Sequence, residues 1–372
     1  MNELESLTVT SKATGRTELG TGVTAAGLGA IDSADYRQPM TRLLDLRAWM
    51  SDDLAELEKV VRTAACPAGR KTHRDTTAVA RAAEYILGLP GKRIRPTCVL
   101  LGARLGGRPF DEQVCDLAVA CELVHAATLL HDDVLDEGDT RRGAPAARVV
   151  FGNPASVLGG DLLLLRAVSL VQKARDWRLL QLLTDTMNDM VNAEAIQLDN
   201  RGGLSLDQGA YLEVIQGKTA GLFRWAFAAG GIISGMSADE VTILGKIGDA
   251  IGLGFQLMDD VLDVSGAAEV LGKAPLADLR EGKMTWPYLI AAERNPELLR
   301  IVHDYIEASK EGRTPSAEPV MAAIIATGAL DETKAFALEQ AEIAQTLLRT
   351  LPDSVARDAI GVVIDAAVER NA

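Results

Sequence analysis

The sequence predicts an all-α protein, and three observations carry that prediction. Apolar residues recur at every third or fourth position over nearly the whole chain, which is the period of an amphipathic helix. No run of β-branched residues alternates for the length of a strand, and aromatic residues make up only 4% of the composition. The periodic segments break at Gly/Pro clusters such as 89–92 and 106–109. We therefore expect a single all-α domain of roughly a dozen helices with short connections.

The first segment, residues 1–38, is rich in Thr, Gly, Ala and Ser and lacks a helical period, so we expect a disordered tail there. Residues 39–372 are expected to form the one folded domain. Its first helical pattern consists of apolar residues three or four apart: Leu43, Leu46, Met50, Leu54, Leu57 and Val61. Two later segments open with a capping box, in which a Ser precedes Gln or Glu by three residues, at Ser205 and Ser237.

Charge and cysteine content narrow the class of protein. The chain carries 52 acidic and 38 basic residues, and its net charge of −14 argues against general binding to nucleic acid or anionic lipid. The four cysteines lack metal-ligand spacing, which indicates buried thiols in a reducing cytoplasm. We recognise no signal peptide. The longest apolar stretches, 155–172 and 220–236, are interrupted by charged residues, so no transmembrane segment is expected.

Two matching acidic clusters give the first indication of chemistry. The letters Asp-Asp-Val-Leu-Asp occur at 132–136 and again at 259–263, each time after an apolar run. Positions i and i+4 share one face of a helix, so the first and last carboxylates of each cluster converge and repel each other. A solvated helix cap is the ordinary explanation for one such cluster. Two identical clusters predict a paired site for Mg²⁺, which joins carboxylates to substrate phosphates.

Basic residues gather in the segments around these clusters. Each one alone is explained as a solvated surface group, but together they predict a cationic ring around a diphosphate. The groups are Lys92, Arg93 and Arg95 at a helix entry, Arg141 and Arg142 after the first cluster, Lys218 and Thr219 before an apolar helix, and Lys273, Arg280 and Lys283 after the second cluster. The Gly-Lys-Thr at 217–219 is not a Walker A motif, because the upstream Gly and strand are missing.

These motifs together resemble those of trans-type polyprenyl diphosphate synthases, most closely the medium- and long-chain members. The resemblance runs from about residue 38 to the C-terminus, on the motifs GKRIRP (91–96), HAATLLHDDVLDEGDTRRG (125–143), GKTAGLF (217–223), GFQLMDDVLD (254–263) and LGKAPLADLREGK (271–283). It implies the isoprenoid synthase fold, an orthogonal helical bundle around a central cavity. It also implies that 39–372 is a catalytic domain, that the protein is a homodimer, and that Mg²⁺ is its cofactor. We expect it to act in the cytoplasm.

The resemblance also implies roles for individual residues. A magnesium cluster on the diphosphate of the allylic substrate is implied for Asp132, Asp133, Asp136, Asp259, Asp260 and Asp263. Contacts to that diphosphate are implied for Arg141, Lys218, Thr219, Gln256, Lys273 and Lys283. The metal-free site for isopentenyl diphosphate is implied for Lys92, Arg95, His125 and Arg142, although His125 alone reads as a core histidine. Glu194 and Gln197 match a family signature without an assigned role.

The expected reaction follows from the charges. Mg²⁺ and the cations stabilise the diphosphate that leaves when the allylic C–O bond ionises. The double bond of isopentenyl diphosphate attacks the allylic cation, and a proton is then lost, with the departing diphosphate as the expected base. The product is an all-trans allylic diphosphate one isoprene unit longer. The catalytic residues expected from this scheme are Asp132, Asp133, Asp136, Arg141, Lys218, Asp259 and Asp260.

Product length is predicted from the helix below Asp132. No Phe or Tyr stands between Phe110 and Phe151, so the positions of Ala127 and Thr128 leave room for a deep tunnel. One helical turn rises about 5.4 Å, close to one extended isoprene unit. We therefore expect a product of about 30 to 50 carbons, unless another helix supplies the floor.

Other enzymes with related motifs are alternatives. The main one is a short-chain geranylgeranyl or farnesyl diphosphate synthase. A class I terpene cyclase needs a different second metal motif, and neither it nor a head-to-head synthase has a use for Lys92, Arg95 and Arg142. A non-catalytic partner subunit usually loses one aspartate cluster, whereas this chain keeps both. One departure from the family pattern is Leu276, which stands where Gly is usual.

Overall fold

A computed structural model describes residues 43–65, 73–201, 206–265, 275–311, 313 and 315–369. The predicted tail and the residues Cys66, Ser205 and Lys273 lie outside this part of the chain. Residue contacts divide the chain into Met1–Arg37 and Gln38–Ala372. The described residues of the second unit are helical except for turns and one antiparallel pair of short strands, β1 (Thr140–Arg141) and β2 (Ala144–Pro145). The predicted all-α class is confirmed.

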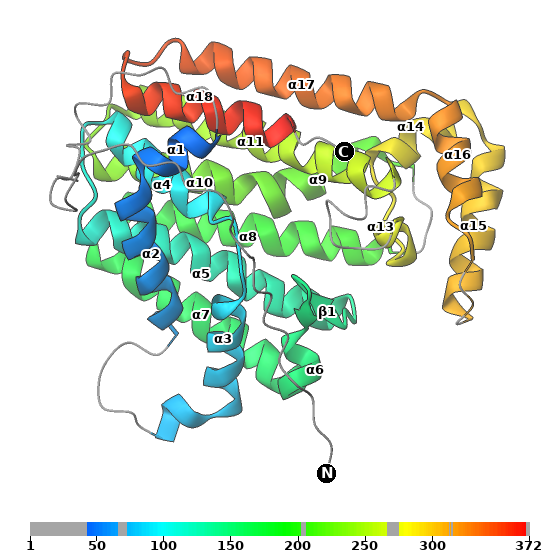
Figure 1. The fold of residues 1–372 in the computed structure, drawn as a ribbon, viewed down its shortest axis with the longest axis horizontal. Helices are drawn as coiled ribbons and strands as arrows, with labels where there is room; N and C mark the ends of the chain where they lie inside the picture. The colour runs from blue at the N-terminus through cyan, green and yellow to red at the C-terminus, as the bar shows by residue number, and fades with distance from the viewer. Residues whose placement is uncertain are drawn as a thin grey trace, which may run out of the picture. The chain divides into compact units, whose positions relative to one another are not determined.

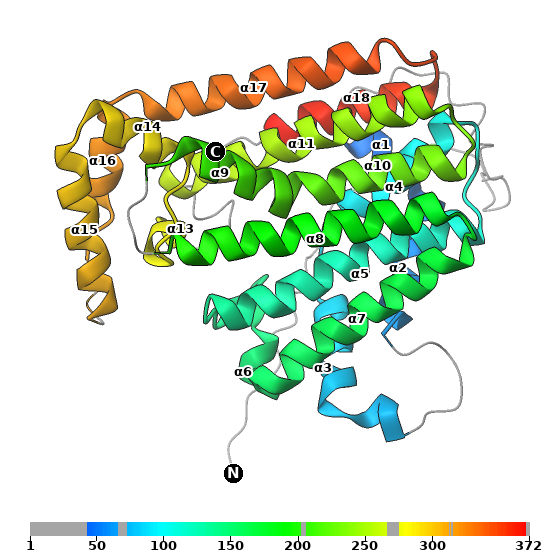
Figure 2. The same cartoon turned by 180° about the vertical axis from the view of Figure 1, so that it is seen from behind.

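The first half of the chain builds one side of the bundle. The long helices α5 and α7 pack along each other, and α3 and α4 flank them (Figures 1 and 2). The elements are α1 (Leu43–Trp49), α2 (Ser51–Thr63), the 3₁₀ turn η1 (His73–Thr76), α3 (Ala78–Gly88), α4 (Ile94–Leu105), α5 (Glu112–Leu135), α6 (Ala147–Phe151), α7 (Asn153–Lys173) and α8 (Trp177–Asp199). The apolar pattern that opens at Leu43 therefore spans two helices rather than one.

The second half of the chain completes the bundle. Helices α8, α10, α11 and α17 lie side by side, while α15 and α16 form an arm at one end (Figure 2). The elements are α9 (Gln208–Ile215), the π-helical turn η2 (Gln216–Ala220), α10 (Gly221–Ile233), α11 (Ala238–Ser265), α13 (Ala277–Arg280), α14 (Trp286–Arg294), α15 (Glu297–Lys310), α16 (Glu318–Ala326), α17 (Ala329–Leu348) and α18 (Val355–Val368).

Side-chain caps fix where several helices begin. The predicted capping box at Ser237 is confirmed, because the Ser237 backbone N–H donates to Glu240 Oε2 at 2.9 Å and the Glu240 N–H donates to Ser237 Oγ at 3.3 Å. The other predicted box is wrong in its register. Helix α9 begins at Gln208, and Asp207 caps it by accepting from the Ala210 N–H at 3.0 Å.

Three helices are long and apolar enough to cross a membrane by length and composition alone, namely α5, α7 and α11. The apolar window of α5 is 78% buried inside the structure and that of α11 is 61% buried, so packing accounts for their composition. The window of α7 is only 39% buried. The expectation of no transmembrane segment is therefore not confirmed, and α7 leaves the apolar residues Val157, Leu158 and Leu165 exposed.

Candidate active site

Both acidic clusters lie near the carboxyl ends of long buried helices. Asp132 and Asp133 are in the last turn of α5, and Asp136 ends that helix, its N–H donating to the Asp132 carbonyl at 2.7 Å. The second cluster, 259–263, occupies the last two turns of α11. The apolar residues that precede each cluster bury the helix and thereby fix where its carboxylates emerge.

The two clusters meet at two adjoining cavities. The first cavity, about 230 Å³, is lined by residues that include Asp132, Asp136, Asp260 and Lys283. The second cavity, about 640 Å³, is lined by residues that include Asp132, Asp259 and Asp263. The walls shared by both cavities are formed by Asp132, Arg141, Lys218, Thr219, Gln256 and Asp278. The structure thus brings together most of the residues that the sequence assigns to the allylic diphosphate; Lys273 lies outside the described residues.

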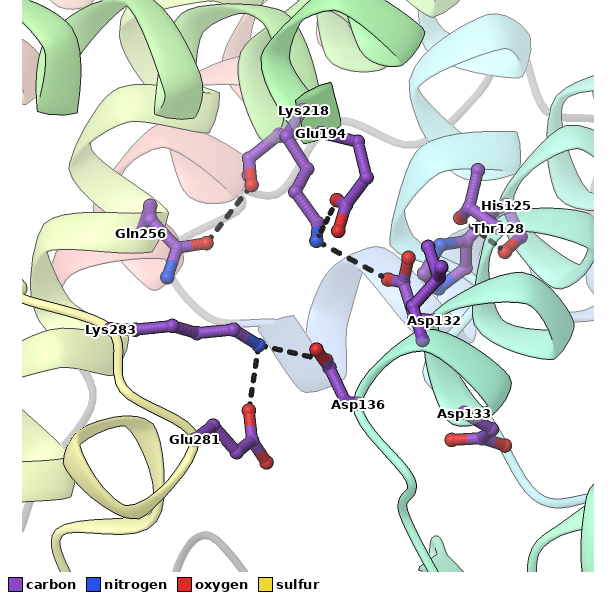
Figure 3. A network of polar contacts seen from close by, with 12 residues as sticks. His125, Thr128, Asp132, Asp133, Asp136, Glu194, Lys218, Gln256, Glu281 and Lys283 are labelled. Carbon is purple, nitrogen blue, oxygen red and sulfur yellow. Dashed lines mark hydrogen bonds and ion pairs between the residues drawn. The ribbon is translucent and has the colours of Figure 1, made fainter. Parts of the chain in front are cut away.

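Two lysines bind the carboxylates that face these cavities (Figure 3). Lys283 Nζ donates to Asp136 Oδ2 at 2.8 Å and to Glu281 at 2.6 Å. Lys218 Nζ lies 3.7 Å from Asp132 Oδ2 and donates to Glu194. Because each lysine is paired with carboxylates in this structure, an incoming diphosphate would compete for cations that are already held in place.

The second aspartate of each cluster is buried and held by hydrogen bonds from other side chains. Asp133 is fully buried and accepts from Arg141 Nε at 2.8 Å. Asp260 is also fully buried; it accepts from the Tyr211 hydroxyl, and from Gln256 Nε2 at 3.0 Å. Asp263 accepts from the Ala277 N–H at 2.9 Å and so caps the start of α13.

Burial and neighbouring charges set the protonation of the site. Burial raises the pKa of Asp132 to about 6, since the nearby Glu194 and Asp136 charges offset the effect of Lys218. Burial also acts to raise the pKa of Asp136, but Lys283 outweighs it and holds that pKa below its ordinary value. Burial together with Arg95 and Arg142 keeps the pKa of His125 well below its ordinary value, so this imidazole is neutral at pH 7.

The fit of the site to a divalent cation depends on its donor atoms. No three His, Cys, Asp or Glu side chains in the described parts of the chain converge closely enough to hold a metal ion on their own. Mg²⁺ usually takes one or two carboxylates and completes its shell with water and phosphate oxygens. The cavity walls offer hard carboxylate oxygens, and Asp136 Oδ1 is buried without a hydrogen bond, its ion-pair partner Arg201 lying 3.5 Å away. These donors fit a cation that is shared with a bound phosphate.

Close backbone packing places Lys218 and Thr219. They lie in the π-helical turn η2, a rare geometry that shifts the side chains which follow. A Cβ at Gly217 would lie 2.7 Å from the Asp189 carbonyl oxygen, and a Cβ at Gly252 would lie 2.4 Å from the Ala220 Cα. Only glycine permits these approaches, which bring η2 against α8 and α11.

A third cavity, about 300 Å³, contains the remaining predicted cations. Its walls include Lys92, Arg95, His125 and Arg142. Arg95 and His125 also line the second cavity, so the second and third cavities adjoin. Arg95 lies over the Phe223 ring, 4.6 Å from its centroid. The structure therefore gathers the four residues that the sequence assigns to isopentenyl diphosphate at one place.

A neighbouring arginine supports this cationic cavity. Arg93 is buried at the start of α4 with a left-handed backbone, φ 52°. Its guanidinium donates to Glu58 at 2.8 Å, to Glu122, and to the Leu87 carbonyl at 3.0 Å. Arg93 also lines the third cavity, and these bonds hold the segment between Lys92 and Arg95 in shape.

Comparison with known proteins decides the family. Residues 76–324 match the family model described as Polyprenyl synthetase. The chain belongs to this family. It is 38% identical to the octaprenyl diphosphate synthase of Escherichia coli over 288 residues, 77% of this chain and 88% of the relative. It is 31% identical to the geranylgeranyl diphosphate synthase of Methanosarcina mazei over 295 residues, 78% and 89% of the two chains.

A solved structure of the same family agrees in fold. The polyprenyl synthase of Caulobacter crescentus, crystallised with calcium and isoprenyl diphosphate, is 35% identical and superposes with a TM-score of 0.78. The match covers 88% of this chain and 97% of that one. The isoprenoid synthase fold expected from the motifs is confirmed.

Within this polyprenyl synthase fold, the two residues predicted to set chain length differ in position. Thr128 lines the second cavity, opposite Met190 and Val191 of α8. Ala127 is completely buried and is not among the residues that line that cavity. Successive helix residues point about 100° apart, so Ala127 packs in the core while Thr128 faces the cavity.

Sequence reasoning missed one side chain of this polyprenyl synthase site and left another unresolved. Tyr211 contacts Asp260 from α9, and nothing in its sequence surroundings marks it. Leu276, noted for replacing Gly, adopts the left-handed conformation that glycine favours, φ 59°, and its side chain is fully buried. The Leu276 N–H donates to the Asp263 carbonyl at 3.0 Å, which ties the loop to α11.

Proposed function

We propose that this protein is a trans-prenyltransferase that condenses isopentenyl diphosphate onto an allylic diphosphate with Mg²⁺ and releases diphosphate. The observation that carries the proposal is the set of three adjoining cavities. Carboxylates and lysines line the first two, as an allylic diphosphate with bound cations requires. Cations around a neutral His125 line the third, which suits a diphosphate bound without metal.

The proposed metal ligands are narrower than the two clusters. Asp132, Asp136 and Asp259 are the proposed direct ligands. Asp260 and Asp263 also line the cavities, but they accept hydrogen bonds from Tyr211 and from the Ala277 N–H. Asp133 and Asp260 are fully buried and engaged by Arg141 and Tyr211, so they are proposed to hold neighbouring groups instead. Bound Mg²⁺ would neutralise charge on the leaving diphosphate.

Side chains of the protein position the two substrates. Lys218, Lys283 and Arg141 would hold the allylic diphosphate, and this binding orients the C–O bond that ionises. Lys92, Arg95, His125 and Arg142 would hold isopentenyl diphosphate so that its double bond faces the allylic carbon. The electron pair of that double bond forms the new C–C bond, and the proton that is lost goes to the departing diphosphate.

We propose a product of about 30 to 50 carbons in preference to a short one. The second cavity is the largest of the three. The residues of α5 and α8 that line it include no Phe, Tyr or Trp, and in the described part of the chain the one such residue in its walls is Phe255 of α11. The octaprenyl relative is also more similar to this chain than the geranylgeranyl relative, at 38% against 31% identity.

A homodimer is also proposed. Five of the exposed large apolar residues lie on the neighbouring helices α7 and α8: Val157, Leu158, Leu165, Trp177 and Val191. Exposed apolar residues on neighbouring helices support an interface with a second copy of the protein. Sedimentation should therefore give twice the chain mass, and Leu165→Glu should shift the protein toward monomer.

A diphosphate-release assay tests the reaction class. Diphosphate should appear only when isopentenyl diphosphate and an allylic primer are both present, and chelation of divalent cations should stop it. A terpene cyclase would release diphosphate from the allylic substrate alone. Absence of release with every primer would contradict the proposed function.

A further inference from the structure

Asp260 stands at the centre of a chain of hydrogen bonds. Its Oδ1 accepts from Gln256 Nε2 at 3.0 Å, and its Oδ2 accepts from the Tyr211 hydroxyl and from the Trp286 N–H at 3.4 Å. The carboxylate is fully buried. Both of its oxygens thus accept hydrogen bonds from protein donors, whereas Asp136 Oδ1 accepts none.

The hydrogen bonds continue from Asp260 through Gln256 to the cavity walls. Because Nε2 is the donor to Asp260, the amide oxygen of Gln256 points the other way and accepts from the Thr219 hydroxyl at 2.9 Å. An amide oxygen has two lone pairs, so one is left after this bond. Gln256 and Thr219 line both the first and the second cavity, and Gln256 lies across the site from Asp132 (Figure 3).

The Tyr211 end of these hydrogen bonds is held rigidly. Tyr211 comes from α9, and its ring centroid is 5.4 Å from that of Trp286, which in turn is 5.3 Å from that of Phe336. This aromatic column joins α9, α14 and α17, so the Tyr211 hydroxyl has little freedom to leave Asp260. The orientation of the Gln256 amide is therefore set by Asp260 and, through it, by Tyr211.

We propose that Tyr211 is a positioning residue that acts through Asp260 to aim the Gln256 amide oxygen at the developing allylic cation. The inference rests on the proposed function. As the allylic C–O bond breaks, its electron pair leaves with the diphosphate, and the positive charge remains on carbon near the junction of the first two cavities. An amide oxygen already aimed at that point stabilises the charge without reorganising. Asp260 then orients Gln256 and does not bind metal.

The first test compares Tyr211→Phe with Tyr305→Phe. Tyr305 is a matched control, because Tyr305→Phe also removes one hydroxyl that contacts another side chain, Arg280 at 2.9 Å. For Tyr211→Phe we expect kcat to fall roughly 10- to 100-fold, while the KM of both substrates and the half-saturating Mg²⁺ concentration stay unchanged. Tyr305→Phe should match the wild type. Wild-type kcat in Tyr211→Phe would overturn the inference.

The second test swaps the pair that Tyr211 orients, and it does not depend on how well Tyr211→Phe folds. In Asp260→Asn, the carbonyl oxygen of the new amide accepts from the Trp286 N–H, and its NH₂ faces Gln256. The Gln256 amide must then rotate and turn its own NH₂ toward the cavity, so kcat should fall. Adding Gln256→Glu restores an acceptor on both sides and should recover most of the lost kcat. Failure of this recovery, with a raised Mg²⁺ requirement in both variants, would show that Asp260 is a metal ligand and overturn the inference.

These outcomes separate the inference from the function beneath it. A wild-type protein that elongates a primer, with variants that behave otherwise than described, would overturn the role of Tyr211 alone. A wild-type protein that makes no product from any primer would overturn the proposed function as well.

Discussion

Replacing Thr128 by Phe should shorten the product. Thr128 lines the second cavity one helical turn before Asp132, which is about 6 Å along the axis of α5. The next turn, at Val124, lies about 12 Å away. A ring at Thr128 would close the cavity after about one further isoprene unit beyond the diphosphate end. We therefore expect Thr128→Phe to stop after the first condensations, with products far shorter than the about 30 to 50 carbons expected of the wild type.

The assay uses labelled isopentenyl diphosphate with farnesyl or geranyl diphosphate as primer, followed by chromatographic sizing of the hydrolysed products. Ala127→Phe is the matched comparison, since the adjacent residue is buried in the core instead of lining the cavity. It should cost about 1–3 kcal/mol of unfolding free energy by overpacking. An unchanged product distribution for Thr128→Phe would refute the argument that this wall limits chain length.

Three other substitutions test the electrostatics and the packing of the site. Asp132→Asn should abolish turnover yet stabilise the metal-free protein. Folding raises the pKa of Asp132 from 3.8 to about 6, so ionised Asp132 lowers the unfolding free energy by up to about 3 kcal/mol above pH 6 and by nothing below pH 4. Urea unfolding in EDTA should therefore show a more stable Asp132→Asn variant at pH 8 and no difference from the wild type at pH 4. Equal stability at pH 8 would contradict this. Leu276→Gly removes the strain of a left-handed backbone at a non-glycine residue, which stabilises the fold by about 1 kcal/mol. It also removes a fully buried side chain, which destabilises the fold by about 2 kcal/mol. Its loop should therefore exchange amide hydrogens faster, and slower exchange would mean that strain dominates. Arg93→Met leaves the buried Glu122 without its cation and should lower the unfolding free energy by about 3–5 kcal/mol; a stability equal to the wild type would show that Glu122 finds another partner.

The parts of the site that sequence predicts well are those in which local spacing fixes geometry. Asp132 and Asp136 are one helical turn apart, so their shared face follows from the sequence, and the apolar runs before both clusters correctly predict buried helices. The capping box at Ser237 is predicted for the same reason, because all of its bonds lie within four residues.

The parts that sequence does not predict depend on which helix lies opposite. Whether Thr128 or Ala127 faces the cavity depends on the position of α8, which no local pattern encodes. The bond from Tyr211 to Asp260 joins residues 49 apart, and the π-helical turn that places Lys218 has no sequence signature. The second aspartate of each cluster looks identical to the first in sequence, yet it is fully buried and accepts a hydrogen bond from a partner outside its own helix, Arg141 for Asp133 and Tyr211 for Asp260.

The most direct test of the account is elongation by the full-length protein. Purified protein with Mg²⁺, labelled isopentenyl diphosphate and farnesyl diphosphate should yield a ladder of all-trans polyprenyl diphosphates that ends between about 30 and 50 carbons. Incorporation that ends at 20 carbons would contradict the proposed product length. No incorporation from any allylic primer would contradict the assignment of the three cavities to prenyl transfer.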